Sequence, residues 1–149
     1  MEPLSILRSP PVVVLASLAA QRLLSRGSST SPATSLLGAA VAAAGLGVAA
    51  AGIREIRAAG TTLDPTRPAD ASKVVRQGIY RYSRNPIYLG DALLLAGYAI
   101  HRRDLLAILP VAGFVGVIDT FQVSAEEEAL RDRFGSTYGD YVASVRRWL

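Results

Sequence analysis

The sequence predicts an all-α membrane protein of about four transmembrane helices, with a C-terminal helical hairpin and a cytoplasmic amphipathic tail. Half of the 149 residues are hydrophobic and only 19% are charged, whereas a soluble domain usually carries about 25% charged residues. The apolar residues are concentrated in four blocks, at 11–24, 35–59, 86–100 and 105–123, which are separated by polar, arginine-rich segments. We see no internal repeat and expect one domain, residues 1–149.

The first two blocks differ in length. A helix of about 20 residues crosses a hydrocarbon core of about 30 Å. The second block, Ser35 to Ala59, has this length, and its small residues at 38, 45, 47 and 52 favour close approach of another helix, within the bundle or between protomers. The first block, 12–24, is shorter and contains Gln21 and Arg22. We interpret it as a short uncleaved span, with an interfacial helix as the alternative; a cleaved signal peptide fits less well.

The last two blocks predict a helical hairpin. The third reaches span length when it is counted from Arg84 or Asn85 to Ile100, and the fourth runs from Leu105 to Val123 with a predicted kink at Pro110. Only residues 101–104 separate them, so the two helices should be antiparallel neighbours.

The arginines predict how the helices are oriented. The loop from Arg54 to Arg84 holds seven basic residues and the tail after Val123 holds four, whereas four lie on the opposite side of a four-span topology. Under the positive-inside rule the loop, the tail and both termini are cytoplasmic. The net charge of +4 then suits anionic lipid, and we expect no nucleic-acid partner.

Some kinds of site are excluded by composition. The chain has no cysteine and a single histidine, His101. Disulfides, thiolate metal sites, cysteine nucleophiles and histidine-cluster metal sites are therefore absent, and we predict no metal site.

The segment 78–90, GIYRYSRNPIYLG, combines arginine, tyrosine and a helix start. Pro86 suits the first turn of a helix that Asn85 would cap. A helix N-terminus beside Arg81 and Arg84 could bind an anion. The alternative is that these arginines and tyrosines only anchor the helix at the membrane surface.

The tail after Val123 begins with three glutamates, 126–128, and ends in an aromatic, basic stretch. Glu127 and Arg131 have the spacing of a helix-surface ion pair. Tyr138, Tyr141 and Trp148 could form an interfacial belt of an amphipathic tail, which is the alternative to a binding site.

Asp91 and Asp119 lie inside or near the last two spans. Intramembrane acids are candidates for function, and the alternative is that both are simply hydrated or paired near an interface.

Two motifs resemble a known family. They are Gly-x-Tyr-Arg-x-x-Arg-Asn-Pro-x-Tyr-x-Gly at 78–90 and Glu-Glu-x-x-Leu-x-x-x-Phe-Gly-x-x-Tyr-x-x-Tyr at 126–141, continued by the Val145 to Trp148 stretch. The chain resembles the integral-membrane methyltransferases that include isoprenylcysteine carboxyl methyltransferase and the phospholipid N-methyltransferases. The segment from Gly60 to Pro65 is similar to a bacterial branch of this group, so we expect a bacterial inner-membrane protein.

The resemblance implies methyl transfer from S-adenosylmethionine, bound at the cytoplasmic face, to a lipid or lipophilic small-molecule acceptor. The cofactor-binding residues that it implies are Arg84, Asn85, Pro86, Tyr88, Gly90, Glu126 and Glu127. The catalytic or acceptor-side residues are Glu127, Arg147 and Tyr141, with Tyr138 as a further candidate. The chain departs from the family at Ser144, where lysine or arginine is common and Arg146 could substitute.

The acceptor and the oligomeric state stay open at this point. A carboxylate acceptor would need no general base, whereas an amine would need one, with Glu127 as the candidate; a thiol also fits. Two other functions remain. One is a small four-helix transporter, but such a protein should carry an acid in its early spans, and no acid precedes Arg54 in the first two apolar blocks. The other is a non-catalytic membrane scaffold, which the two intact motifs argue against.

Overall fold

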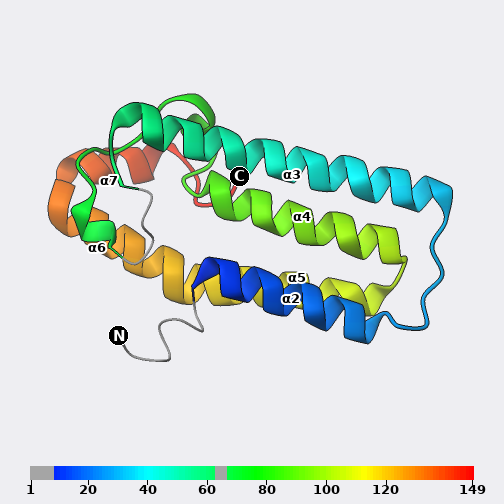
Figure 1. Ribbon diagram of the computed structural model, residues 1–149. Helices are drawn as coiled ribbons and strands as arrows, with labels where there is room; N and C mark the ends of the chain where they lie inside the picture. Colours follow the sequence, from blue (N-terminus) through cyan, green and yellow to red (C-terminus); the bar gives the residue numbers. More distant parts are fainter. Residues whose placement is uncertain (1–8, 63–66) are drawn as a thin grey trace.

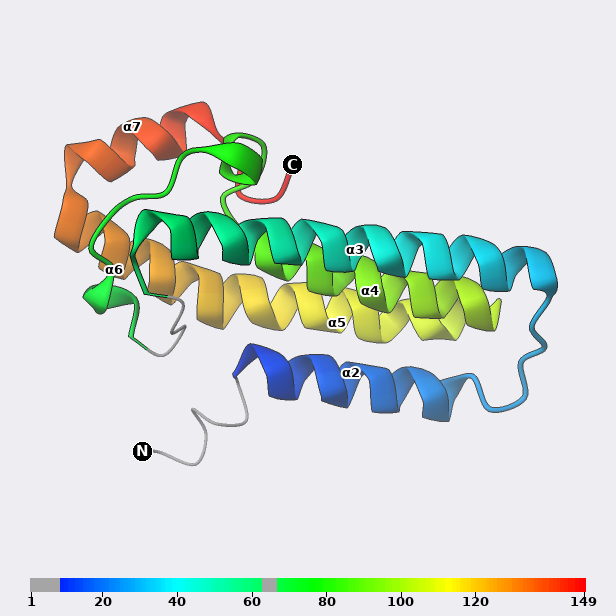
Figure 2. The same ribbon diagram turned by 45° about the horizontal axis from the view of Figure 1, so that its top comes forward.

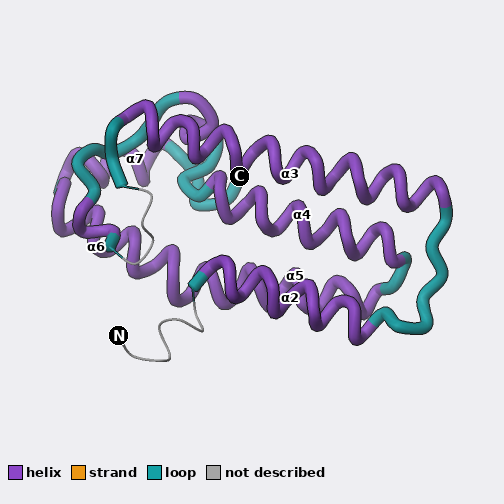
Figure 3. The backbone as a smooth tube through the Cα atoms, in the orientation of Figure 1, coloured by secondary structure: helices purple, strands orange, loops and turns teal. Residues whose placement is uncertain are grey.

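The computed structural model describes residues 9–62 and 67–149, and over these ranges the chain is helical with no strand (Figures 1 and 3). Three long helices are α2 (Pro10–Leu24), α3 (Pro32–Ala59) and α4 (Pro86–Arg102). A fourth, continuous rod comprises η3 (Leu105–Ile108), α5 (Leu109–Val117), the π-helical turn η4 (Ile118–Val123) and α6 (Ser124–Phe134). The short helix α7 (Ser136–Ser144) and the 3₁₀ turns η1 (Pro68–Asp70) and η2 (Gly78–Arg81) lie at one end of the bundle. The predicted all-α class is confirmed.

Glycines bring α3 and α4 together along the length of α4 (Figure 2). A Cβ atom at Gly45 would lie 2.5 Å from the carbonyl oxygen of Gly90, and one at Gly97 would lie 2.5 Å from that of Gly38. No side chain fits at these distances, so the seven-residue glycine spacing sets the separation of the two helices. The close approach predicted from the small residues is thus made to α4, whereas Gly47 has nothing within 4 Å.

Two of these rods are long and apolar enough to cross a membrane. They are Pro32–Ala59, with a mean hydropathy of 2.1 in its most apolar window, and Leu105–Phe134, with 1.8. Only 17% and 28% of those windows are buried inside the protein, and large side chains such as Leu36 and Leu105 are 75% and 82% exposed. The apolar surfaces therefore face outward, as they do in a membrane protein.

Prolines begin the helices. Pro10, Pro32 and Pro86 each occupy the first turn of a helix, where their missing N–H groups need no partner. The start of α4 at Pro86, behind Asn85, is as predicted. Pro110, where the kink was predicted, lies in the first turn of α5, directly after the 3₁₀ turn η3. A second departure from α-helical geometry follows at the π turn Ile118–Val123.

The two ends of the bundle are built differently. At one end a two-residue turn joins α4 to η3, as the predicted hairpin requires, and Arg103 adopts a left-handed conformation with φ of 52°. Gln21 holds α2 to this hairpin, because its Nε2 atom donates to the carbonyls of Leu95 and Ala107 at 2.9 Å each. The arginine-rich loop and the tail are together at the other end, as the four-span prediction requires (Figure 1).

Candidate active site

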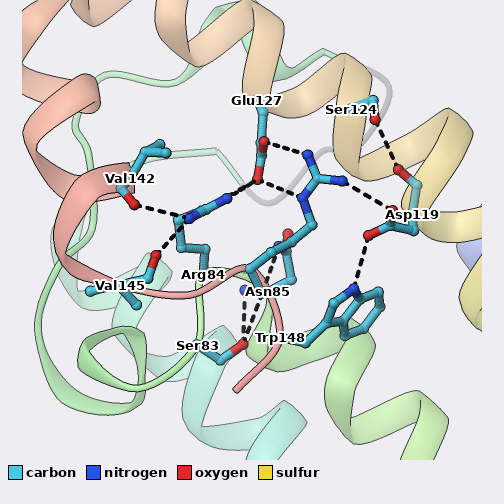
Figure 4. Close-up of polar contacts among 10 residues, drawn as sticks. Ser83, Arg84, Asn85, Asp119, Ser124, Glu127, Val142, Val145 and Trp148 are labelled. Atoms are coloured by element: carbon cyan, nitrogen blue, oxygen red, sulfur yellow. Dashed lines mark hydrogen bonds and ion pairs between the residues drawn. The ribbon is translucent and has the colours of Figure 1, made fainter.

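The candidate site lies where the loop that leads into α4 meets the C-terminal tail (Figure 4). The Arg84 backbone N–H donates to the Arg146 carbonyl at 3.0 Å, and Asn85 Nδ2 donates to the Arg147 carbonyl at 3.0 Å. Ser83 Oγ also donates to the Arg147 carbonyl, at 3.3 Å. Asn85 thus occupies the predicted N-cap position of α4, but its side chain makes no cap hydrogen bond and holds the tail instead.

Glu127 is the centre of the polar network in this site. Arg84 Nη2 donates to Glu127 Oε1 at 2.7 Å, and Arg147 Nη2 donates to Oε2 at 2.8 Å. The Glu127 and Arg84 side chains are only 8% and 9% exposed. The ion pair expected between Glu127 and Arg131 is not formed, because Glu127 faces inward, toward arginines that are distant in sequence, and Arg131 is exposed.

The two guanidinium groups control the ionisation of Glu127. Burial by itself would raise the pKa of Glu127, but the hydrogen bonds and charges of Arg147 and Arg84 outweigh it and hold the pKa below its ordinary value. Arg84 is fixed in turn, because its Nη1 donates to the carbonyls of Val145 at 2.6 Å and Val142 at 3.3 Å. Glu127 is therefore an ionised group that positions both arginines.

A second acid reaches Arg147 from the π turn. Asp119 Oδ2 accepts from Arg147 Nη1 at 3.0 Å, and Asp119 Oδ1 accepts from Trp148 Nε1 at 2.8 Å (Figure 4). Asp119 is thus paired through both of its carboxylate oxygens.

Glu126 has a different environment from its neighbour. Its Oε1 atom accepts from the Tyr88 hydroxyl at 2.5 Å and from Gln122 Nε2 at 2.7 Å. Both of these donors are uncharged. Burial raises the pKa of Glu126 against the opposing effect of the two hydrogen bonds.

The two tail tyrosines point inward. Tyr138 and Tyr141 are 2% and 4% exposed, so they do not form an exposed interfacial belt. The Tyr141 hydroxyl donates to the Tyr80 carbonyl at 2.7 Å, and the Arg76 guanidinium lies 5.8 Å from the Tyr141 ring centre. Burial raises the pKa of Tyr138 to about 12, so its hydroxyl is a neutral donor and acceptor at physiological pH.

A pocket opens beside this network. Predicted residues that line it are Arg84, Asn85, Tyr88, Glu126, Glu127, Tyr138 and Tyr141. Three predicted residues do not line it: Gly90 packs against α3, Pro86 packs close to Gly52 of α3, and Arg147 contacts Glu127 from outside the pocket.

Much of the remaining pocket wall was not predicted. It consists of Ile56, Thr61, Thr62, Pro68, Ala71, Lys73, Val74, Val75, Tyr80, Ile87 and Leu130. Lys73 is the one lysine of the chain, and this rarity was a signal that could have singled it out. The noted segment from Gly60 to Pro65 lies partly outside the described residues.

The fold and this site define a class: an all-helical protein with two candidate membrane-spanning helices and a mixed polar and apolar pocket at one end of the bundle. The chain belongs to the phospholipid methyltransferase family, whose match covers residues 33–137. The resemblance inferred from the two motifs is therefore confirmed. This is a methyltransferase family, so the match supports an enzyme that acts on a membrane substrate.

Other comparisons add less about function. An uncharacterized protein of Haemophilus influenzae is 40% identical over 63 residues, which are 42% of this chain and the whole of that protein. No solved structure gives a significant match to the chain.

Proposed function

We propose that this protein transfers a methyl group from S-adenosylmethionine to a lipophilic or membrane-embedded acceptor at the cytoplasmic face of a bacterial inner membrane. The observation that carries the proposal is the pocket formed by both family motifs, with Arg84 and Tyr88 from the first and Glu126, Glu127, Tyr138 and Tyr141 from the second. Residues 38 or more positions apart in the sequence are in direct contact there.

The groups in the pocket fit the chemistry of this cofactor. S-adenosylmethionine has a sulfonium cation, an amino-acid group, ribose hydroxyls and an aromatic base. The pocket offers carboxylate and phenol groups at Glu126, Tyr88 and Tyr138, an ammonium group at Lys73, and an apolar wall that includes Val74. Carboxylates suit ammonium and hydroxyl groups, and cations suit a carboxylate, so these residues would hold it.

The chain's own contribution is positioning. When bound, the cofactor supplies an electrophilic methyl group, and methyl transfer is an in-line displacement that depends on alignment. Arg84 is fixed by Glu127 and by two carbonyls, so the pocket wall is rigid before any ligand binds. Preorganised charge of this kind needs no rearrangement during the reaction.

The acceptor would be a carboxylate, an amine or a thiol at the membrane surface. Tyr138 and Tyr141 line the pocket and would orient it, whereas Arg147, the other predicted acceptor-side residue, lies outside the pocket and is paired with Glu127 and Asp119. A carboxylate needs no proton removal. For an amine, the general-base role that the resemblance gives Glu127 fits the structure less well than the same role for Glu126. Two arginines lower the pKa of Glu127 and make it a weak base, whereas burial raises that of Glu126.

We further propose four membrane spans, formed by α2, α3, α4 and the part of the last rod from Leu105 to Val123, with both termini in the cytoplasm. The loop and the tail, which hold most of the basic residues, share one end of the bundle. That end is the cytoplasmic one under the positive-inside rule.

Cofactor binding to the detergent-purified protein tests the proposal directly, by isothermal titration calorimetry with S-adenosylmethionine. We expect wild type to bind, and both Arg84→Ala and Glu127→Ala to lose most of the affinity. Glu128→Gln, which changes an exposed acid beside the pocket, is the matched control and should bind as wild type does. A folded wild-type protein that does not bind the cofactor would refute the proposed function.

A further inference from the structure

We propose that Asp119 is a positioning residue for this reaction: it fixes Arg147 and Trp148, and through Arg147 it aligns the Glu127–Arg84 pair that lines the pocket. The inference rests on the proposed function and assigns to it a residue from outside both family motifs. Asp119 does not itself line the pocket, so any effect on the reaction must pass through its partners.

A series of hydrogen bonds connects Asp119 to Arg84 through Arg147 and Glu127. One carboxylate oxygen accepts from Arg147 at 3.0 Å and the other accepts from Trp148 at 2.8 Å. Arg147 continues to Glu127 through two donors, at 2.8 Å and 3.2 Å. Glu127 then accepts from Arg84 at 2.7 Å. Asp119 is therefore the end of a continuous ionic network that reaches the pocket wall.

The π turn is what places Asp119 in this network. In a regular α-helix, residues eight positions apart point about 80° away from each other. A π turn acts as one inserted residue, so Asp119 and Glu127 become equivalent to residues seven apart, which differ by only about 20°. Asp119 lies in the turn Ile118–Val123, and the rest of that turn separates it from Glu127. Both carboxylates consequently face the tail, and a single guanidinium, that of Arg147, contacts both.

The charges of the network also balance only when Asp119 is included. Glu127 and Asp119 carry two negative charges, and Arg84 and Arg147 carry two positive charges. Glu127 and Arg84 are almost fully buried, while Asp119 and Arg147 are 34% and 33% exposed. Without Asp119, Arg147 would lose one of its two acidic partners, and a net positive charge would remain beside the buried Glu127–Arg84 pair. Arg147 would then be free to leave the geometry that holds Glu127.

Two alternative roles for this acid fit the contacts less well. A hydrated surface acid would not have each of its oxygens occupied by a different side chain of the tail. An acid that carries protons or ions across a membrane must be free to release its partner, whereas Asp119 is held by an arginine and an indole from a separate segment. Holding the tail is what the geometry supports.

The experiment compares Asp119→Asn with Asp119→Glu and with the matched control Asp140→Asn, an exposed acid of α7. Trp148 is the only tryptophan of the chain, so its fluorescence and its quenching by acrylamide report the tail contact without an added label. Turnover is measured with radiolabelled S-adenosylmethionine and membrane lipid extract, and cofactor affinity by calorimetry.

We expect Asp119→Asn to increase quenching of Trp148 and to lower kcat about tenfold, the effect of weakening one charge-assisted hydrogen bond. Cofactor affinity should fall much less than in Glu127→Ala, because the direct ion pair between Glu127 and Arg84 remains. Asp119→Glu should recover part of both signals, and Asp140→Asn should change neither. Retained cofactor binding by Asp119→Asn separates positioning from a general loss of folding, which would abolish binding as well.

Two kinds of result would contradict these expectations. Wild-type turnover in Asp119→Asn, or reduced turnover with unchanged Trp148 quenching, overturns this inference and leaves the proposed function intact. If wild type itself neither binds nor uses the cofactor, the proposed function is wrong and the positioning role of Asp119 is overturned with it. The binding measurement on wild type therefore distinguishes the two failures.

Discussion

Glu126 and Glu127 are neighbours in the chain, yet their surroundings shift their pKa values in opposite directions. One carboxylate accepts from two neutral donors and the other from two arginines. Adjacent acids with separated pKa values can take different tasks in one site. Here two arginines lower the pKa of Glu127, whereas burial raises the pKa of Glu126.

The role of Glu127 predicts a large loss of stability in Glu127→Gln. The amide cannot neutralise Arg84 and Arg147, so a buried guanidinium would lose its counter-charge. Breaking a buried pair in this way costs about 3 to 5 kcal/mol, and the partial exposure of Arg147 places the expected loss toward the lower value. Thermal unfolding in detergent measures it. Glu128→Gln should leave the unfolding temperature unchanged, and an equal effect of both variants would contradict the assignment.

The same residue predicts how stability depends on pH. The pKa of Glu127 is lowered in the folded protein from an ordinary value of 4.5. Its contribution is therefore fully present above that value and is lost as the pH falls through the folded pKa. Glu126 acts oppositely, because a raised pKa favours the folded state below the ordinary value and disfavours it as the pH rises through the folded pKa.

Unfolding temperatures recorded between about pH 3 and pH 7 separate the two acids. Glu127→Gln should flatten the loss of stability in acid, while Glu126→Gln should remove an opposing slope and make the loss in acid steeper. Identical pH profiles for both variants would show that the two carboxylates do not have the opposite environments described.

At the scale of elements, the α3–α4 contact predicts a sharp difference between two nearby glycines. Gly45→Val should separate the helices and lower the unfolding temperature strongly, because a Cβ there would lie 2.5 Å from the Gly90 carbonyl oxygen. Gly47→Val places the same side chain where nothing lies within 4 Å and should have little effect. A similar loss in both variants would mean that helix propensity, rather than the contact, controls stability.

Some features of these elements could be predicted from the sequence and others could not. The glycine spacing predicted a close helix contact, because side-chain volume at regular positions is a local property. The partner helix was not predictable from that spacing alone. The π turn has no comparable local signal, yet it decides that Asp119 and Glu127 face the same segment. Glu127 was predicted to pair with Arg131 because the two are neighbours on a regular helix. That spacing does not show that Glu127 faces Arg84 and Arg147, which are distant in sequence.

At the scale of the whole molecule, the two motifs predicted which residues meet, since Arg84, Tyr88, Glu126 and Glu127 line one pocket. The motifs did not predict the wall formed by the loop after α3, which includes Thr61 and Lys73. That wall depends on how an irregular segment crosses the end of the bundle, and no periodic pattern encodes such a path.

Chain topology decides whether the pocket opens to the cytoplasm, and the absence of cysteine from the chain makes the topology measurable. Two variants, each with one introduced cysteine, report the topology. Ser29 lies in the link between α2 and α3 and Ala143 lies in α7, and both are exposed, near opposite ends of the bundle. In right-side-out bacterial spheroplasts, a membrane-impermeant maleimide should label Ser29→Cys and spare Ala143→Cys. Inverted vesicles should give the reverse, and labelling of both from one side would contradict the proposed orientation.

A third single-cysteine variant, Pro11→Cys, tests whether α2 spans the membrane. This helix has 15 residues and is therefore about 22 Å long, less than the roughly 30 Å of a hydrocarbon core. Local thinning of the bilayer can accommodate such a helix at modest cost, and the contacts of Gln21 with Leu95 and Ala107 keep it beside the hairpin. Pro11→Cys, exposed in the first turn of α2, should then be labelled from the same side as Ala143→Cys. Labelling from the side of Ser29→Cys would instead place α2 along the membrane surface and reduce the bundle to three spans.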